Sequence, residues 1–436
     1  MRESMAAPMP APVAEPVPAP EPEAAADGVP EPVPAADGVP VPDTVPVPVP
    51  EPAADTVPVP EPAADGVPEP VPGTLTVHRA GLSAVQDLGR LGRSRYGLPV
   101  NGALDQYSAR VANVLTGNDE SAPLLEITAL DFGCTPSADT LVAVTGAPCD
   151  LTVDGISRPR WEPVVVRAGE TIRITGIRLG VRVYLAVHGS VRTPFLLGSC
   201  APDTVLAFGR SLRDGDELAL RTRCPPIHHP VFGIPLFRMQ APVPRFGPPW
   251  TIDATDGPDL AEFGASADRL FRSEFTVTPQ SNHIGLRMHG DVPRRVATGE
   301  VLSRGVPVGA VEVPTGDELL VLHRGRGVTA GYPVLAVVTS TGLSGLGQAR
   351  PGQSVRFRRR TVAEAVAAYR AQRAGIEALR TRVRAVFDVL RIPVPAPVLP
   401  APARPVPPLP TASSSSASPA SLSAPPPLPL PVPVSE

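Results

Sequence analysis

The chain has 436 residues, and its 39 lysine plus arginine residues nearly balance its 43 aspartate plus glutamate residues. None of the basic residues is a lysine, which excludes a phosphate-loop lysine, a Schiff-base lysine and a lysine general base. The 4 cysteines lie far apart and form no CxxC pair, so we predict neither a zinc cluster nor a disulfide framework.

The 7 histidines show no metal-ligand spacing on any predicted helix, and we expect no metal site. The one adjacent pair, His228 and His229, falls in a proline-rich stretch. The N-terminus lacks the apolar region of a signal peptide, and no run of about 18 apolar residues occurs. We therefore expect a cytoplasmic protein with no membrane partner.

The first 72 residues repeat proline, valine, alanine and acidic residues, and contain no aromatic side chain. They hold 13 acidic residues against one arginine. Such a segment cannot bury enough surface to offset the roughly 1 to 2 kcal/mol per residue that ordering a backbone costs. We predict a disordered acidic tail over 1–72 and a disordered Pro/Ser-rich tail over 392–436, both acting as tethers or spacers. The acidic tail serves solubility, or else self-shielding or partner docking.

Residues 73–223 are predicted to form a first lobe. Short β-branched runs alternate there with glycine-containing turns, a pattern typical of an antiparallel barrel or sandwich. The sequences VDG at 153–155 and RAGE at 167–170 predict hairpin turns. Apolar residues at helical spacing predict one helix within 105–118, with Asp105 as its N-cap and Gly117 as its stop.

A proline-rich connector over 224–249 separates this lobe from a second β-rich lobe over 250–360, in which a short helix is predicted near 261–271. The segment 361–391 then carries apolar residues at helical spacing beside many arginines, and predicts an amphipathic helix. For its arginine face we favour solvent or a partner protein over a membrane or nucleic acid.

Several separated motifs of the first lobe carry a family resemblance. They are AVQDLGR at 84–90, GLPVNGALD at 97–105, AN at 112–113, TGN at 116–118 and LEIT at 125–128. In this order they resemble the family of the 5-oxoprolinase C subunit, the Kip-A proteins, allophanate hydrolase subunit 2 and the biotin-dependent carboxyltransferase region of urea carboxylase. The resemblance extends over about residues 74–360. It implies a mainly β fold with two cyclophilin-like β-barrel lobes.

The second lobe resembles the same family at PQS (279–281), at Arg287 and in the segment TAGYP (329–333). It also departs from the family pattern. Asn282 and His283 stand where an aspartate and an arginine are usual, and Gly325 stands where an aspartate is usual. Glu312 replaces a glutamine.

The resemblance implies two sets of site residues. Asp87 and Arg90 are expected to be catalytic, although an aspartate and an arginine three apart could equally form a structural clamp within a loop. Asn113 and Glu126 could likewise hold the helix against the barrel. The expected substrate contacts are Gln86, Asn113, Gln280, Ser281, Arg287, Glu312, Arg326 and Tyr332.

The resemblance implies ATP-driven opening of the lactam 5-oxo-L-proline to L-glutamate, carried out with homologues of the A and B subunits of 5-oxoprolinase. ATP would be bound with a partner protein, because this chain lacks a phosphate-loop lysine. One alternative is carboxyl transfer to a urea-like amide, with biotin carried by a partner. Another is a non-catalytic module that binds a homologue of the B subunit. No nucleic-acid partner is expected.

Overall fold

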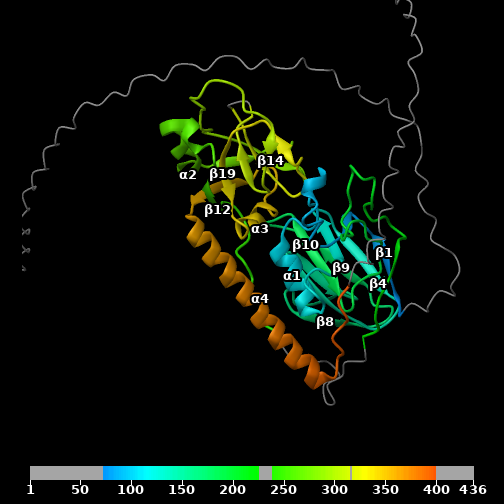
Figure 1. The fold of residues 1–436 in the computed structure, drawn as a ribbon. Coiled ribbons are helices and arrows are strands. Elements are labelled where there is room, and N and C mark those ends of the chain that lie inside the picture. The colour runs from blue at the N-terminus through cyan, green and yellow to red at the C-terminus, as the bar shows by residue number, and fades with distance from the viewer. Residues whose placement is uncertain (1–71, 225–237, 315–316, 399–436) are drawn as a thin grey trace, which may run out of the picture. The chain divides into compact units, whose positions relative to one another are not determined.

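Most of the chain that can be described is β-structure arranged in two lobes (Figure 1). The computed structural model describes residues 72–224, 238–314 and 317–398. Of the predicted tails over 1–72 and 392–436, residues 1–71 and 399–436 lie outside these residues, as does the part of the connector that contains His228 and His229. Residues 392–398 of the predicted C-terminal tail are described, and Ile392 is buried in a cluster with α4. All described residues belong to one unit of the chain. The expected mainly β fold is confirmed.

The first lobe consists of two sheets that face each other across an apolar core. Its strands are β1 (Thr74–Arg79), β2 (Leu82–Gln86), β3 (Leu124–Thr128), β4 (Phe132–Pro136), β5 (Thr140–Gly146), β6 (Asp150–Val153), β7 (Ile156–Ser157), β8 (Pro163–Val166), β9 (Ile172–Thr175), β10 (Arg182–Val187) and β11 (Glu217–Ala219). One sheet has the order β11-β1-β4-β9-β6-β7 and the other β2-β3-β10-β5-β8. Val77, Leu125, Phe132, Val144 and Ile174 are among the buried residues that fill the space between them.

Of the two predicted hairpin turns, one is confirmed and one is wrong. Strands β6 and β7 pair across the turn at 154–155, as predicted. The turn at 167–170 is not a hairpin, because β8 pairs with β5 in one sheet whereas β9 pairs with β4 and β6 in the other. Both segments carry the sequence of a tight turn. The packing of the two sheets determines that the chain passes from one sheet to the other at 167–170.

The predicted first-lobe helix is α1 (Gln106–Leu115), which packs on β5 and β10. Asp105 is its N-cap, as predicted, and the Asp105 carboxylate accepts hydrogen bonds from the Ser108 backbone N–H (3.1 Å) and hydroxyl (2.6 Å). Val111, Val114 and Leu115 form its buried face. The cap therefore fixes where this helix begins and leaves a carboxylate buried at the start of α1.

The second lobe is a closed barrel. Its strands are β12 (Trp250–Asp256), β13 (Phe275–Val277), β14 (Gly285–Gly290), β16 (Ala310–Glu312), β17 (Leu319–Leu322), β19 (Val334–Val338) and β20 (Ser354–Arg359), in the order β12-β19-β16-β17-β14-β13-β20. A parallel pairing of β12 with β20 closes the barrel. A two-stranded ribbon of β15 (Arg304–Gly305) and β18 (Thr329–Ala330) forms a separate small sheet.

Short helices complete this lobe. The segment Leu260–Asp268 is a 3-10 helix that leads into α2 (Arg269–Arg272), at the predicted position. Helix α3 (Gly342–Leu346) is not predicted by its sequence, because GLSGL is dominated by residues that disfavour helices. Its Leu343 and Leu346 are buried in the barrel core. Tertiary burial therefore overrides a poor local propensity at this position.

The predicted amphipathic helix is α4 (Val362–Leu390), drawn in orange in Figure 1. Thr361 and Glu364 form a capping box at its start. Its buried residues Ile376, Leu379 and Val383 pack against α1 and neighbouring side chains of the first lobe. Among the residues described, no helix is both long and apolar enough to cross a membrane.

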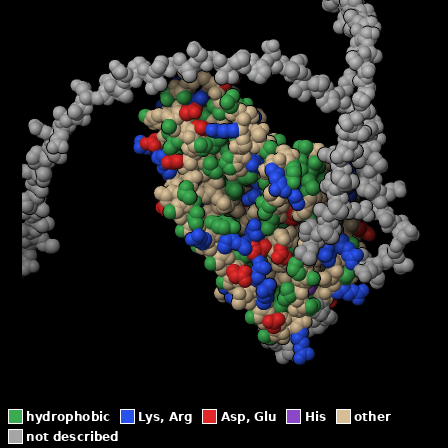
Figure 2. Space-filling model, in the orientation of Figure 1, with side chains coloured by type: hydrophobic (Ala, Val, Ile, Leu, Met, Phe, Trp, Pro, Cys, Tyr) green, Lys and Arg blue, Asp and Glu red, His purple; other side chains and the backbone are tan. Residues whose placement is uncertain are grey.

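Arginines of α4 anchor it to the first lobe by ion pairs. Arg373 and Arg380 both bind the Glu120 carboxylate, which also accepts from Arg110 at 2.7 Å. Burial alone would raise the pKa of Glu120, but hydrogen bonds from Arg373 and Arg110 outweigh it and lower the pKa to about 2. Figure 2 shows acidic and basic side chains interspersed on this face. Part of the arginine face thus serves an intramolecular contact.

Replacing Glu120 should detach part of α4 from the first lobe. We expect Glu120→Ala to lower the free energy of unfolding by roughly 3 kcal/mol, because it leaves partly buried arginines without their shared counter-ion. The difference should be seen in urea denaturation at pH 7 and should shrink as the pH falls through 4.5 toward 2, where Glu120 is protonated. Glu377→Ala, which removes an exposed partner of Arg380, is the control and should cost under about 1 kcal/mol. Equal losses in the two variants would contradict the anchoring role.

Candidate functional site

The loop after β2 is held by a buried polar clamp. The Asp87 carboxylate accepts hydrogen bonds from the backbone N–H groups of Gly89 and Cys200 (each 2.8 Å) and from the Ser199 hydroxyl (2.7 Å). Arg90 is 1% exposed and donates to the Ala201 carbonyl. This arrangement joins the loop to the segment 199–203, and it favours the structural alternative that the sequence left open for both residues.

Arg90 also faces the side chains of Asp203 and Phe208. Its guanidinium lies 3.6 Å from the Asp203 carboxylate and 5.4 Å from the centre of the Phe208 ring. Burial lowers the pKa of Arg90, although Asp203 and Asp87 oppose the shift. A guanidinium loses its proton only far above neutral pH, so Arg90 remains a cation that is paired inside the protein.

Asn101 extends this network to the second lobe. Its side-chain amide donates to the Asp203 carboxylate (2.8 Å), and its backbone N–H donates to the Arg324 carbonyl (2.9 Å). The loop 97–105 therefore lies against the loop that follows β17. Two segments that carry family motifs, one from each lobe, meet at this contact.

The departures from the family pattern at Gly325 and His283 are coupled in space. A Cβ atom built on Gly325 would overlap the His283 ring and lie 2.9 Å from the His283 carbonyl oxygen. The same atom would lie 3.3 Å from the Asn101 side-chain oxygen. The His283 ring thus occupies the space that any side chain at position 325 would need. An aspartate at 325 would therefore require the His283 ring and backbone to move.

A second buried polar cluster joins the lobes beside the start of α1. The Gln348 side-chain amide donates to the Asp105 carboxylate (2.8 Å) and the Arg182 carbonyl (3.0 Å). Its oxygen accepts from the backbone N–H groups of Val181 (3.1 Å) and Arg182 (2.9 Å). Gly347 permits the approach, since a Cβ there would lie 2.7 Å from the Leu104 carbonyl group.

Tyr184 and Glu126 continue this cluster within the first lobe. The Tyr184 hydroxyl donates to Glu126 (2.7 Å) and accepts from the Asp105 backbone N–H (2.9 Å). Glu126 also accepts from the Leu104 N–H (3.1 Å) and lies 3.7 Å from the Arg182 guanidinium. Sequence reasoning missed Tyr184, Arg182 and Gln348. The one sign of them in the sequence is that they are polar residues within otherwise apolar strand and loop segments.

Burial shifts the pKa values of the ionisable groups around this cluster. It raises the pKa of Asp105, against the hydrogen bonds from Ser108 and Gln348. It lowers the pKa of Arg324 to about 10, with Arg110 contributing, and that of His323 to about 3. At neutral pH Arg324 is therefore charged and His323 is neutral. His323 is not available as a proton donor near pH 7.

Glu312 is a buried carboxyl of the second lobe that lacks hydrogen-bond partners among the described residues. It is 0% exposed, and neither side-chain oxygen is paired there. Burial raises the pKa of Glu312 to about 7, although the charge of Arg304, which is paired with Asp259, opposes the shift. Glu312 can therefore exchange a proton near neutral pH, which suits either acid–base work or neutral hydrogen bonding.

The other predicted substrate contacts are dispersed. Asn113 is buried and donates to the carbonyls of Glu120 (3.3 Å) and Ala122 (2.8 Å). These bonds favour the alternative in which Asn113 holds α1 in place. Gln86 lies half-buried on β2. Ser281 and Arg287 are joined through the Ser281 hydroxyl, which accepts from the Arg287 N–H at 3.0 Å.

The last three predicted residues differ in exposure. Arg326 is 5% exposed and donates two hydrogen bonds to the Val306 carbonyl (3.0 and 2.7 Å), while its Nη1 has no partner among the described residues. Gln280 is exposed. Tyr332 is 43% exposed and lines an open groove of about 790 Å³ together with Arg294, Arg295 and Glu300. Within the described ranges no group of three or more histidine, cysteine, aspartate and glutamate side chains could hold a metal ion.

Comparison with known proteins confirms the family. The model of the family described as "carboxyltransferase domain, subdomain A and B" matches residues 96–359. The chain belongs to this family. It is 33% identical over 316 residues to the C subunit of 5-oxoprolinase from Escherichia coli (strain K12), a match that covers 71% of this chain and 98% of that protein.

Larger proteins contain a similar region. The chain is 31% identical over 294 residues to urea amidolyase of Saccharomyces cerevisiae, a match that covers 63% of this chain but only 16% of that protein. The structure of the K. lactis urea amidolyase matches with a TM-score of 0.64 and 27% identity, covering 71% of this chain and 20% of that one. The chain thus spans about a fifth or less of these urea amidolyases.

Removing the Asp87 carboxylate should chiefly destabilise the fold. We expect Asp87→Ala to lower the free energy of unfolding by roughly 3 kcal/mol, because the buried N–H of Cys200 and the Arg90 cation lose an acceptor and a counter-charge. Urea denaturation of the isolated chain measures this loss. Arg95→Ala, on an exposed part of the same loop, should change stability by under about 0.5 kcal/mol. An Asp87→Ala protein of unchanged stability would instead support a catalytic role.

Glu312 should make stability depend on pH. The pKa of Glu312 in the folded protein, about 7, lies above the ordinary 4.5. The contribution of Glu312 to the free energy of unfolding is therefore fully favourable below pH 4.5, and it is lost as the pH rises through 7. We expect Glu312→Gln to be more stable than the parent by roughly 2 to 3 kcal/mol at pH 8, and the gap to close near pH 4.5. Urea denaturation at the two pH values measures both gaps. A gap independent of pH would show that Glu312 does not titrate in this range.

Proposed function

We propose that this chain is the counterpart of the C subunit in an ATP-dependent 5-oxoprolinase, and that it acts in the cytoplasm with homologues of the A and B subunits. The reaction would convert 5-oxo-L-proline, ATP and water to L-glutamate, ADP and phosphate. The observation that carries the proposal is the 33% identity that extends over 98% of the C subunit of 5-oxoprolinase from Escherichia coli. The similarity therefore includes nearly the whole of that protein.

The chemistry requires activation of an unstrained lactam. Phosphorylation of the amide oxygen by ATP would supply that activation, and the nucleotide would be bound with a partner protein. In this chain Arg326 Nη1, which no described residue pairs, offers a hydrogen-bond donor, and Glu312 offers an acceptor or a proton. These two groups suit the carbonyl and N–H of an amide. Arg287 would suit a carboxylate if it exchanged its present partner Glu318.

Exposed apolar residues on two first-lobe loops fit a partner protein. Leu91 and Tyr96 are 65% and 59% exposed, and Val205 is 73% exposed. The two loops are joined by the Asp87 and Arg90 clamp and by a 3.4 Å hydrogen bond from Arg93 to the carbonyl of Leu197, which is 39% exposed. Exposed apolar residues gathered on adjoining loops are typical of protein interfaces. The clamp would then position this surface.

A second candidate function is carboxyl transfer to a urea-like amide. The 31% identity to the urea amidolyase of Saccharomyces cerevisiae and the carboxyltransferase family match favour it. Because the chain contains no lysine, biotin would have to arrive on a partner protein. The remaining alternative is a regulatory module that binds a homologue of the B subunit without catalysis.

Reconstitution tests the leading proposal. Co-expression with homologues of the A and B subunits should give a complex that releases phosphate and L-glutamate only when ATP and 5-oxo-L-proline are both present. The double variant Leu91→Asp/Leu197→Asp should keep its thermal stability but fail to co-purify, because charges in an apolar interface core are costly. Val389→Asp, at an 82% exposed position on α4, is the matched control and should co-purify normally.

The alternatives give different outcomes in the same assay. A complex that forms without ATP-dependent ring opening, and that carboxylates urea when carboxybiotin is supplied on a carrier, would favour carboxyl transfer. A complex inert in both assays would favour the regulatory module. Failure to form a complex with either homologue would refute the proposed role in a multi-subunit enzyme.

A further inference from the structure

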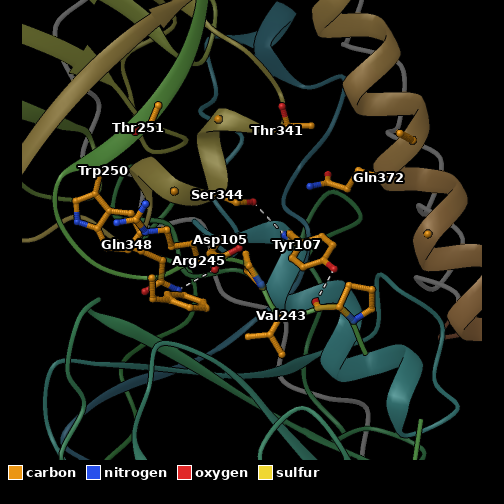
Figure 3. Close-up of a pocket in the computed structure, with 17 residues that line it drawn as sticks. Asp105, Tyr107, Val243, Arg245, Trp250, Thr251, Thr341, Ser344, Gln348 and Gln372 are labelled. Atoms are coloured by element: carbon orange, nitrogen blue, oxygen red, sulfur yellow. Dashed lines mark hydrogen bonds between the residues drawn. The ribbon is translucent and has the colours of Figure 1, made fainter. Parts of the chain in front are cut away.

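A cavity of about 470 Å³ lies where α1, α3, α4 and the segment 242–246 meet (Figure 3). Its size is within the usual range of small-molecule sites. Its wall includes Asp105 and Gln348 of the interlobe cluster, but most of its lining residues have no part in that cluster. Its lining includes Tyr107, Arg245, Phe246, Trp250, Gln372 and Gly375.

One wall of this cavity is supplied by α4, which lies beyond the part of the chain that the family model matches. That match ends at residue 359, whereas Ala371, Gln372 and Gly375 of α4 line the cavity. Figure 3 shows Gln372 projecting from α4 on the side of Tyr107 and Ser344. One side of the cavity is therefore formed by an element that follows residues 96–359.

Gly375 keeps this wall open. A glycine inside a long helix costs stability relative to alanine, so its presence there needs a packing reason. No close-packing reason is found among the described residues, since a Cβ atom built on Gly375 would meet nothing within 4 Å. The space that its missing side chain leaves belongs to the cavity.

The cavity offers aromatic surfaces and a few polar groups. The rings of Phe246 and Trp250 are perpendicular, with centroids 6.4 Å apart. Tyr107 lines the cavity with its hydroxyl already donating to the Pro242 carbonyl (2.8 Å). The Gln372 amide, by contrast, has no hydrogen-bond partner among the described residues. These features suit a flat ring that carries a polar group.

The charge at the cavity favours an anion. Arg245 is exposed at its rim and makes no ion pair or hydrogen bond with any residue that the structure describes. Among the described lining residues Asp105 is the one carboxylate, and its oxygens are bound by Ser108 and Gln348. The unpaired charge at this site is thus positive.

We propose that this cavity binds a small flat organic acid, with its ring against Tyr107, Phe246 and Trp250 and its carboxylate at Arg245. The site is separate from the proposed amide-binding groups Arg326 and Glu312, which are not among its lining residues. The proposal does not depend on the 5-oxoprolinase assignment. It adds a ligand site of which α4 forms one wall.

Benzoate and its uncharged analogue benzamide are suitable probes. Benzoate should raise the melting temperature of the full-length chain in a saturable manner, with a dissociation constant in roughly the millimolar range for so small a ligand. It should also quench the fluorescence of Trp250, one of the two tryptophans, measured in a Trp161→Phe background. Benzamide should bind about tenfold more weakly, because it lacks the charge-assisted bond to Arg245.

Variants locate the binding. Gly375→Leu should fill the cavity and abolish the benzoate response, whereas Gly375→Ala, which adds only a methyl group, should keep it and slightly stabilise the helix. Ala371→Phe is a second filling variant on the same wall, should Gly375→Leu fail to fold. Arg245→Gln should remove the preference for benzoate over benzamide while leaving benzamide binding unchanged.

The outcomes are distinct. Loss of the response in a folded filling variant, with retention in Gly375→Ala, supports the proposal. A benzoate response that persists in the filling variants places the ligand elsewhere and overturns it. So does the absence of any saturable response in the parent chain. An unchanged preference in Arg245→Gln overturns the assignment of the carboxylate to Arg245.

Discussion

The Gln348 side chain is the interaction on which the arrangement of the two lobes depends. Its amide makes four hydrogen bonds, one to the N-cap carboxylate of α1 and three to backbone groups at the start of β10. Each bond contributes only about 0.5 to 1.5 kcal/mol net, but each buried group left unpaired would cost more. The four hydrogen bonds of Gln348 are therefore expected to form and break together. The backbone bond from Asn101 to the Arg324 carbonyl is a further contact, which joins the loop 97–105 to the loop after β17.

The sequence predicts the parts of this arrangement that depend on local rules. Period-two and helical patterns place the strands, α1 and α4, and Asp105 is recognisable as an N-cap because capping is decided within one turn. Gln348 is not recognisable in this way, because its partners lie 166 or more residues away. The turn sequence at 167–170 predicts a hairpin wrongly for a related reason. That sequence is local, whereas the choice of sheet is made by the core.

The candidate site shows the same division. The spacing of Asp87 and Arg90 indicates that they share a loop, but it cannot distinguish a cleft from a clamp, since that depends on the segment 199–203. Likewise Gly325 and His283 read in the sequence as two unrelated departures from a family pattern. In the structure they form one change, because the His283 ring fills the space beside Gly325. Substitutions in a packed loop contact are not independent.

The two buried glutamates explain why burial alone does not identify a functional carboxylate. Glu120 is almost fully buried, yet arginines hold its pKa at about 2, so it is a fixed anion that anchors α4. Glu312 is also buried, but no described residue donates to it and its pKa rises to about 7. Burial favours the neutral form of both carboxyls, and the number of cations close to each carboxyl decides whether its pKa falls or rises. A carboxyl that keeps a proton near neutral pH can donate, accept or transfer it, whereas a permanently paired one cannot. Of the two glutamates, this difference makes Glu312 the better candidate for the amide chemistry that we propose.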